Sequence, residues 1–225
     1  MTERLLPRRA VLGLALSTSL LAACATMPVQ PPPPPAPPPD PRYGAIEGEP
    51  FNMPAVSLDD LQPRFRRQLV ADPTGEKPGT IVVDPANHFL YLVQENGMAL
   101  RYGVGVGREG LAWSGTANVA YKRAWPRWTP TRDMIRREPE KYARWAGGMD
   151  GGESNPLGAR ALYLFQGGRD TLYRIHGTNE PETIGESVSS GCIRMTNQDV
   201  IDLHRRVAAG ARVVVLPAGP DSAGG

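Results

Sequence analysis

Two side chains in this sequence could act together in nucleophilic catalysis: Cys192 and, upstream of it, His176. The thiolate of cysteine is the nucleophile, and a thiol with the solution pKa of about 8.5 is only a few per cent ionised at neutral pH. A nearby imidazole that accepts the proton makes such a thiol useful. Gly191 lets the backbone turn tightly, so that successive N–H groups can point at a developing oxyanion. The pattern predicts a cysteine nucleophile with a histidine base, and the alternative is a buried cysteine that serves only as a small hydrophobic residue.

The first 23 residues have the layout of an export signal. Basic residues precede an apolar run over 10–23 that is too short to span a bilayer comfortably. Leu21-Ala22-Ala23-Cys24 resembles the lipobox of bacterial lipoproteins, in which the cysteine is lipidated and becomes the new N-terminus. We therefore expect a lipid anchor on Cys24. The alternative is an ordinary signal peptide that contains a cysteine, and the pair Arg8-Arg9 is a weak hint of twin-arginine export.

Charge and cysteine content narrow the function of the remaining chain. The signal carries three basic residues and one acidic residue, so the totals of 25 and 23 become 22 and 22 once it is removed. Nucleic-acid binding depends on an excess of Lys and Arg, which argues against a nucleic-acid partner. With Cys24 at the processing site, no second cysteine remains for a disulfide with Cys192. In an exported protein a lone thiol of this kind suggests chemistry.

The chain divides by composition into five segments. After the signal, residues 24–41 are a lipidated N-terminus and a proline-rich stalk that favours polyproline II. An N-terminal extension covers 42–77, and within it residues 58–69 predict a short helix that begins after Ser57. A catalytic domain over 78–217 and a flexible tail over 218–225 follow.

The elements that must position Cys192 and His176 are mostly strands. β-Branched and aromatic runs predict strands over 80–84, 88–94, 98–107, 116–122, 159–165, 171–175 and 212–216. Helices are predicted over 131–142, capped by Thr131, and over 197–209, capped by Thr196 or Asn197. The fold class is therefore one mainly β domain with a few inserted helices. Strand 171–175 delivers His176 at its end, where the side chain can face a cleft.

Other candidate residues have two interpretations each. Trp125 and Trp128 lie close together on a predicted loop, where aromatic rings either line a substrate groove or pin the loop to the core. His88 stands at a strand end and His204 beside the apolar stripe of a helix. For both histidines a structural role is favoured over a catalytic one.

The ordered motifs resemble a known family. His176-Gly177-Thr178, then Ile184-Gly185, then Ser189-Ser190-Gly191-Cys192-Ile193-Arg194 is similar to the signature of the L,D-transpeptidase catalytic domain, also called the YkuD domain. Asn155-Pro156-Leu157-Gly158 and residues 173–175 lie where that family keeps similar segments. The resemblance covers roughly residues 78–217. It implies a β-sandwich-like fold and an enzyme that acts on peptidoglycan stem peptides outside the cytoplasmic membrane.

The resemblance also implies roles for single residues. Cys192 would be the nucleophile, His176 the proton donor and acceptor, and the Gly177 carbonyl would orient the imidazole. The backbone N–H groups of Ser190, Gly191 and Cys192 would form the oxyanion hole. No metal or cofactor is expected.

Three further residues are predicted to contact substrate: Arg194, Trp128 and Ser189. Arg194 could hold a substrate carboxylate through a bidentate contact, and its alternative role is a structural ion pair. Many family members have a second histidine where this chain has Ser190. His176 is then the only base that the motif offers.

The implied reaction is a two-step acyl transfer. Cys192 would form a thioester with the third residue of a tetrapeptide stem, release D-alanine and pass the acyl group to an amine, which gives a 3-3 cross-link. With water as acceptor the enzyme would be an L,D-carboxypeptidase or hydrolase, and with a protein amine it would attach an envelope protein to peptidoglycan. A non-enzymatic wall-binding lipoprotein is disfavoured because thiol and base are both present. A papain-like peptidase is disfavoured because its cysteine precedes its histidine.

The expected location is the periplasmic side of the cell envelope. Ala25 after Cys24 lacks the aspartate associated with inner-membrane retention. We therefore expect an outer-membrane lipoprotein anchored through Cys24.

Overall fold

The structure, a computed structural model, describes residues 40–107, 113–187 and 192–218. The chain separates into two units, 1–37 and 38–225, and every described residue belongs to the second. The predicted signal and stalk, Cys24, most of the tail, and the segment Ser189 to Gly191 lie outside the described residues. In the described ranges no helix is both long enough and apolar enough to cross a membrane.

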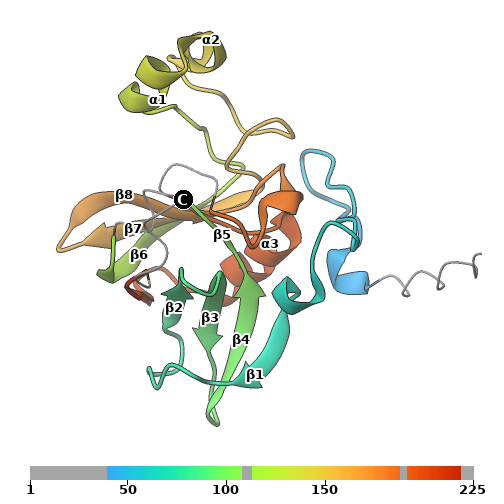
Figure 1. Cartoon of the computed structure of the whole chain (residues 1–225), viewed down its shortest axis with the longest axis vertical. Coiled ribbons are helices and arrows are strands. Elements are labelled where there is room, and N and C mark those ends of the chain that lie inside the picture. The colour runs from blue at the N-terminus through green and yellow to red at the C-terminus, as the bar shows by residue number, and fades with distance from the viewer. Residues whose placement is uncertain (1–39, 108–112, 188–191, 219–225) are drawn as a thin grey trace, which may run out of the picture. The chain divides into compact units, whose positions relative to one another are not determined.

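Ten strands in the described part of the chain form one hydrogen-bonded sheet (Figure 1). The strands are β1 (Gln68–Ala71), β2 (Ile81–Asp84), β3 (Phe89–Val93), β4 (Met98–Gly103), β5 (Gly105–Val106), β6 (Gly115–Ala124), β7 (Arg160–Gln166), β8 (Arg169–His176), β9 (Ile193–Arg194) and β10 (Arg212–Val215). Their order in the sheet is β1-β4-β3-β2-β10-β6-β7-β8-β9-β5. The predicted mainly β fold class is confirmed.

Strand β10 joins the two halves of this sheet. It pairs parallel with β2 on one side and antiparallel with β6 on the other. One hydrophobic core collects side chains from both halves, for example Leu92 from β3 and Leu164 from β7. The sheet must therefore bend around that core. The family resemblance implied a β-sandwich-like fold, and its two layers are here the two halves of one continuous sheet.

Three α-helices occur in the described ranges: α1 (Arg132–Arg137), α2 (Pro139–Tyr142) and α3 (Asn197–Arg206). The predicted helix over 131–142 is present but broken, because Pro139 disfavours helical backbone at Glu138, which has φ −137° and ψ 68°. Thr131 caps α1 by accepting a hydrogen bond from Met134 N at 3.1 Å, as predicted. Thr196 caps α3, which ends at Arg206 rather than at residue 209.

The helix predicted over 58–69 is wrong. Residues Pro63–Phe65 form a single 3-10 turn, η2, and Gln68–Ala71 are strand β1. Pro63 has no N–H to donate, and it holds Gln62 at ψ 139°, outside the helical region. A proline in the middle of an otherwise helical pattern decided the local structure.

Residues 40–77 pack into the same folded body as residues 78–217. Strand β1 pairs antiparallel with β4 along its whole length. Tyr43, Leu61 and Phe65 are buried in a second hydrophobic cluster together with side chains of β2 and β3. Burial of this apolar surface stabilises the sheet from its outer face. The extension is thus part of the scaffold that holds the site.

Candidate active site

Parallel pairing of two strands brings His176 next to Cys192. In β8 and β9, Ile175 lies opposite Ile193 and His176 opposite Arg194. Met195 N donates to the His176 carbonyl at 2.8 Å, which continues this pairing past β9. Cys192 immediately precedes β9, is half-buried, and carries a thiol. Both side chains line one cleft, so the predicted nucleophile and base share a site.

The imidazole of His176 is held in one tautomer. Only 4% of the residue is exposed, and its Nδ1 lies 2.5 Å from the Gly177 carbonyl oxygen. A carbonyl oxygen can only accept, so Nδ1 carries the proton and Nε2 keeps its lone pair. This is the hydrogen bond on which the predicted role of Gly177 depends. The role itself stays a prediction.

Burial also decides the charge of His176. Its pKa is lowered to about 4, chiefly by desolvation and further by the nearby charges of Arg194 and Arg174, while the Gly177 hydrogen bond acts in the opposite direction. The imidazole is therefore neutral at neutral pH. A neutral imidazole can accept a proton from a thiol, and its conjugate acid is disfavoured in this buried position. The site suits a general base that acts during attack.

The backbone around His176 is fixed by Asn197, the first residue of α3. Asn197 Oδ1 accepts from Ala159 N at 2.9 Å, and Asn197 Nδ2 donates to the Thr178 carbonyl at 2.8 Å. The sequence pattern indicated Asn197 only as a possible helix cap. Its partners lie 38 and 19 residues away, so no local spacing reveals them.

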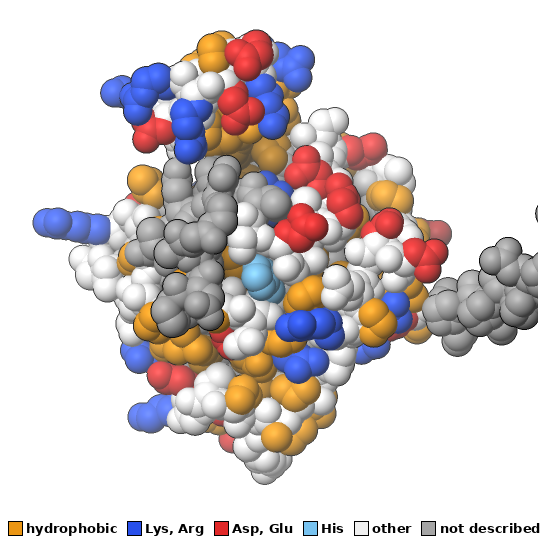
Figure 2. Space-filling view, viewed as in Figure 1, with side chains coloured by type: hydrophobic (Ala, Val, Ile, Leu, Met, Phe, Trp, Pro, Cys, Tyr) orange, Lys and Arg blue, Asp and Glu red, His pale blue; other side chains and the backbone are white. Residues whose placement is uncertain are grey.

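The cleft has a volume of about 760 Å³, and much of one wall comes from the lobe that carries α1, α2 and the 3-10 turn η4 (Ala143–Trp145). Lys and Arg side chains gather on this lobe, interspersed with acidic ones (Figure 2). The basic and aromatic side chains that line the cleft from it are Arg137, Lys141, Tyr142, Arg144 and Trp145. Such a wall can bind anionic and planar groups.

The two tryptophans of the loop have different surroundings. Trp125 is pinned, because its Nε1 donates to Glu49 at 2.8 Å and its ring packs edge-on against Phe51. Trp128 lines the cleft, and its ring centroid lies 6.1 Å from that of Tyr142. Trp125 therefore pins the loop to the core, whereas Trp128 lines the cleft. Substrate contact by Trp128 stays a prediction.

Arg194 also lines the cleft, where it already has protein partners. Its Nη1 lies 3.2 Å from a Glu180 carboxylate oxygen and 3.3 Å from Thr183 Oγ1. The structural ion pair considered from the sequence is thus present, with a carboxylate that is itself about half exposed. Contact of Arg194 with a substrate carboxylate stays a prediction. Ser189, Ser190 and Gly191 lie outside the described residues.

Two further histidines, His88 and His204, lie outside the cleft. His88 Nε2 contacts Ser187 Oγ at 3.0 Å. In the described ranges no group of three or more His, Cys, Asp or Glu side chains could hold a metal ion. The expectation of no metal or cofactor stays a prediction.

Comparison with known proteins identifies the family. The family model described as the L,D-transpeptidase catalytic domain, YkuD, matches residues 78–215. The chain belongs to the YkuD family. The resemblance seen in the motifs is thereby confirmed, and the matched segment contains His176 and Cys192 as well as the strands that place them.

Two curated YkuD relatives illustrate the extent of the similarity. The chain is 36% identical over 138 residues to the probable L,D-transpeptidase YbiS of Escherichia coli strain K12, covering 59% of this chain and 43% of YbiS. It is 32% identical over 149 residues to the putative L,D-transpeptidase YqjB of Bacillus subtilis strain 168, covering 64% and 76%. The chain thus spans less than half the length of YbiS.

A solved structure from Brucella melitensis, named as a probable carnitine operon oxidoreductase caia, is also similar. The identity is 57% and the TM-score 0.50, over 69% of this chain and 96% of that chain. That name describes another activity. Membership of the YkuD family rests on the family model and on the curated relatives, which agree with each other.

Proposed function

We propose that this protein is a peptidoglycan L,D-transpeptidase with Cys192 as nucleophile. The observation that carries the proposal is the shared cleft of Cys192 and a neutral His176 whose Nδ1–H is bonded to the Gly177 carbonyl. Membership of the YkuD family supports the same reaction class. The substrate is the tetrapeptide stem of peptidoglycan.

In the first step the Cys192 Sγ attacks the carbonyl carbon at the L-centre of the third stem residue. His176 Nε2 takes the thiol proton as the S–C bond forms. Backbone N–H groups of residues 190–192 stabilise the oxyanion. The C–N bond to D-alanine then breaks, the amine leaves with the proton from His176, and a thioester on Cys192 remains.

In the second step an amine from another stem attacks the thioester carbonyl. His176 removes a proton from the amine and returns one to the departing sulfur, so the free thiol is regenerated and an amide is formed. The product is a 3-3 cross-link. Attack by water would give an L,D-carboxypeptidase, and attack by a protein amine would attach an envelope protein to the wall.

Basic side chains in the cleft, which stand beside the acidic Glu138, Glu180 and Glu186, can bind the carboxylates of a stem peptide. Stem peptides carry carboxylates, and Arg194, Arg137 and Lys141 all line the cleft. A guanidinium binds a carboxylate through two parallel hydrogen bonds, which fixes orientation as well as affinity. Arg194, which lies opposite His176 in the strand pairing, is our candidate for the substrate carboxylate nearest to the reacting carbonyl.

We propose further that the protein works at the periplasmic side of the envelope, as an outer-membrane lipoprotein anchored through Cys24. The lipobox-like sequence and the proline-rich stretch after it support this location. Metabolic labelling with a palmitate analogue tests it. Label on the full chain that is lost in Cys24→Ser is expected, and an unlabelled wild-type protein would contradict the anchor.

The direct test of activity is incubation of the chain with purified tetrapeptide muropeptides, followed by mass analysis. We expect release of D-alanine and a cross-linked dimer, both absent for Cys192→Ala. A trimmed tripeptide without dimer would identify a carboxypeptidase instead. If D-alanine is not released at all, the proposed function is wrong.

An independent test uses a carbapenem as an acyl-donor analogue. One covalent adduct per chain is expected by intact-mass measurement, located on Cys192 and lost in Cys192→Ala. An adduct that persists in Cys192→Ala would place the nucleophile elsewhere.

A further inference from the structure

We propose that Asn197 is a positioning residue that orients the Gly177 carbonyl and thereby holds His176 in the tautomer with the proton on Nδ1. The inference deepens the proposed function, because it concerns the base of the same site, and its catalytic consequence rests on that function. The tautomer itself can be measured without any reaction.

Hydrogen bonds restrain the backbone on both sides of the Gly177 carbonyl. On one side, Gly177 N donates to the Arg160 carbonyl at 3.0 Å. On the other side, the Thr178 carbonyl accepts from Asn197 Nδ2 at 2.8 Å. The peptide that carries the Gly177 oxygen lies between these two anchored groups. It therefore has little freedom to turn its oxygen away from His176 Nδ1.

Packing adds a second restraint, because the Asn197 amide lies directly against two glycines. A Cβ atom on Gly177 would stand 2.2 Å from Asn197 Oδ1, and a Cβ on Gly158 would stand at the same distance. Real Cβ contacts are never this short, so only glycine admits the amide at either position. The same Oδ1 accepts from Ala159 N, which ties the end of the Asn155-Pro156-Leu157-Gly158 turn to the His176 loop.

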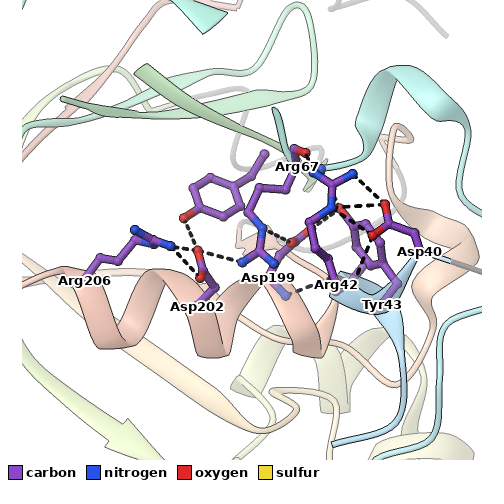
Figure 3. A network of polar contacts seen from close by, with 9 residues as sticks. Asp40, Arg42, Tyr43, Arg67, Asp199, Asp202 and Arg206 are labelled. Carbon is purple, nitrogen blue, oxygen red and sulfur yellow. Dashed lines mark hydrogen bonds and ion pairs between the residues drawn. The ribbon is translucent and has the colours of Figure 1, made fainter. Parts of the chain in front are cut away.

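The first turn of α3 is itself anchored on its opposite side. Gln198 Nε2 donates to the Pro54 carbonyl at 2.8 Å and to the Gly44 carbonyl at 3.2 Å. Asp199 accepts from the Tyr43 hydroxyl at 3.1 Å and lies 3.7 Å from Arg67 (Figure 3). These contacts come from the extension over 42–77. Asn197 thus stands on a helical turn whose next two residues are bonded to the extension.

The tautomer matters because it decides which nitrogen has a lone pair. With the proton on Nδ1, Nε2 is the acceptor that a general base needs. If the Gly177 oxygen turned away, the proton could move to Nε2, and the ring would then offer a donor there. The tautomer of a histidine is decided by the hydrogen bond of its other nitrogen. Asn197 acts on His176 only through Gly177.

The test measures the tautomer directly by ¹⁵N NMR of the full chain labelled at histidine. The ring nitrogen signals of His176 are assigned with His176→Gln. At pH 7 we expect the wild type to show a protonated Nδ1 and an unprotonated Nε2. Asn197→Ala should give a mixture of both tautomers. A variant Asn197→Ala that keeps the wild-type nitrogen shifts would overturn the inference.

Two companion variants keep the test decisive. Asn118→Ala removes another asparagine side chain that donates to a backbone carbonyl, that of Gly210 at 3.0 Å, outside the cleft, and should leave the tautomer unchanged. Asn197→Asp keeps an acceptor for Ala159 N but loses the donor to Thr178. If Asn197→Ala fails to fold, the tautomer of His176 is measured in Asn197→Asp instead. An unchanged tautomer in Asn197→Asp would equally overturn the inference.

The kinetic prediction separates this inference from the proposed function. In Asn197→Ala we expect the acylation rate of Cys192 by a carbapenem to fall about tenfold at pH 7, with the concentration for half-maximal rate within twofold of wild type. A wild-type rate and an unchanged tautomer in Asn197→Ala would overturn the inference alone. A shifted tautomer in a protein whose wild type forms no acyl-enzyme would support the inference and overturn the proposed function.

Discussion

Replacing Gly177 with alanine should be costly, because of one contact with Asn197. The added Cβ would stand 2.2 Å from Asn197 Oδ1, while its next neighbours, Val200 Cγ1 and Ala159 N, would lie at 3.1 and 3.2 Å. The last two contacts need shifts of only a few tenths of an ångström. The first cannot be accommodated unless the Asn197 amide leaves its place.

The size of the effect follows from what the amide would give up. Displacing it breaks two hydrogen bonds of Asn197, each with a net worth of about 1 kcal/mol. Overpacking of a filled site typically adds about 1–3 kcal/mol. We therefore expect Gly177→Ala to lower the free energy of unfolding by about 3–5 kcal/mol. The measurement is equilibrium urea unfolding, in which the midpoint falls while the slope stays constant.

A double-mutant cycle makes the argument specific. In an Asn197→Ala background the clash is already gone, so Gly177→Ala should cost less than about 1 kcal/mol there. Gly147→Ala is the matched control, since a Cβ on Gly147 meets nothing within 4 Å, and it should be nearly neutral. If Gly177→Ala costs the same with and without Asn197, the contact with the amide is not the cause and the reasoning fails.

Three further predictions concern the buried charges. His176 has a folded pKa of about 4, below its value in an unfolded chain, so its share of stability is present above about pH 6.5 and is lost as the pH falls toward 4. That share is roughly 3 kcal/mol. The urea midpoint of His176→Gln, measured against pH, should lack this part of the pH dependence. If the midpoints of wild type and variant change with pH in parallel, the histidine is not buried in its neutral form. Tyr43→Phe should cost about 1–2 kcal/mol in thermal unfolding, because Asp199, whose pKa burial raises to about 7, loses the hydroxyl that donates to it; a neutral effect would show that this hydrogen bond contributes nothing. Glu49→Gln should lower the free energy of unfolding by about 3 kcal/mol, because it leaves the Arg160 guanidinium buried without its carboxylate. Adding Arg160→Met should restore part of that free energy. A further loss of similar size would mean that the two side chains do not stabilise the fold as a pair.

Local sequence signals predicted most of the elements because they depend on residues close in the chain. The strands expected over 80–84 and 88–94 are β2 and β3, and their pairing through the short connection is that of a hairpin. Thr131 and Thr196 cap the helices that follow them. The misassigned helix over 58–69 shows the limit, since the helix-start signal at Ser57 was outweighed by Pro63.

Residue types and motif order were enough to select Cys192 and His176 and to indicate the YkuD family, because the reactivity of a thiol or an imidazole and the order of motifs along the chain are both properties of the sequence. The tertiary structure decided how the base is held. The hydrogen bond from the Asn197 amide to Thr178 joins residues 19 positions apart, and the contact of Tyr43 with Asp199 joins residues 156 positions apart. No periodicity connects such residues, because only the bent sheet and the docked helix α3 bring them within hydrogen-bonding distance.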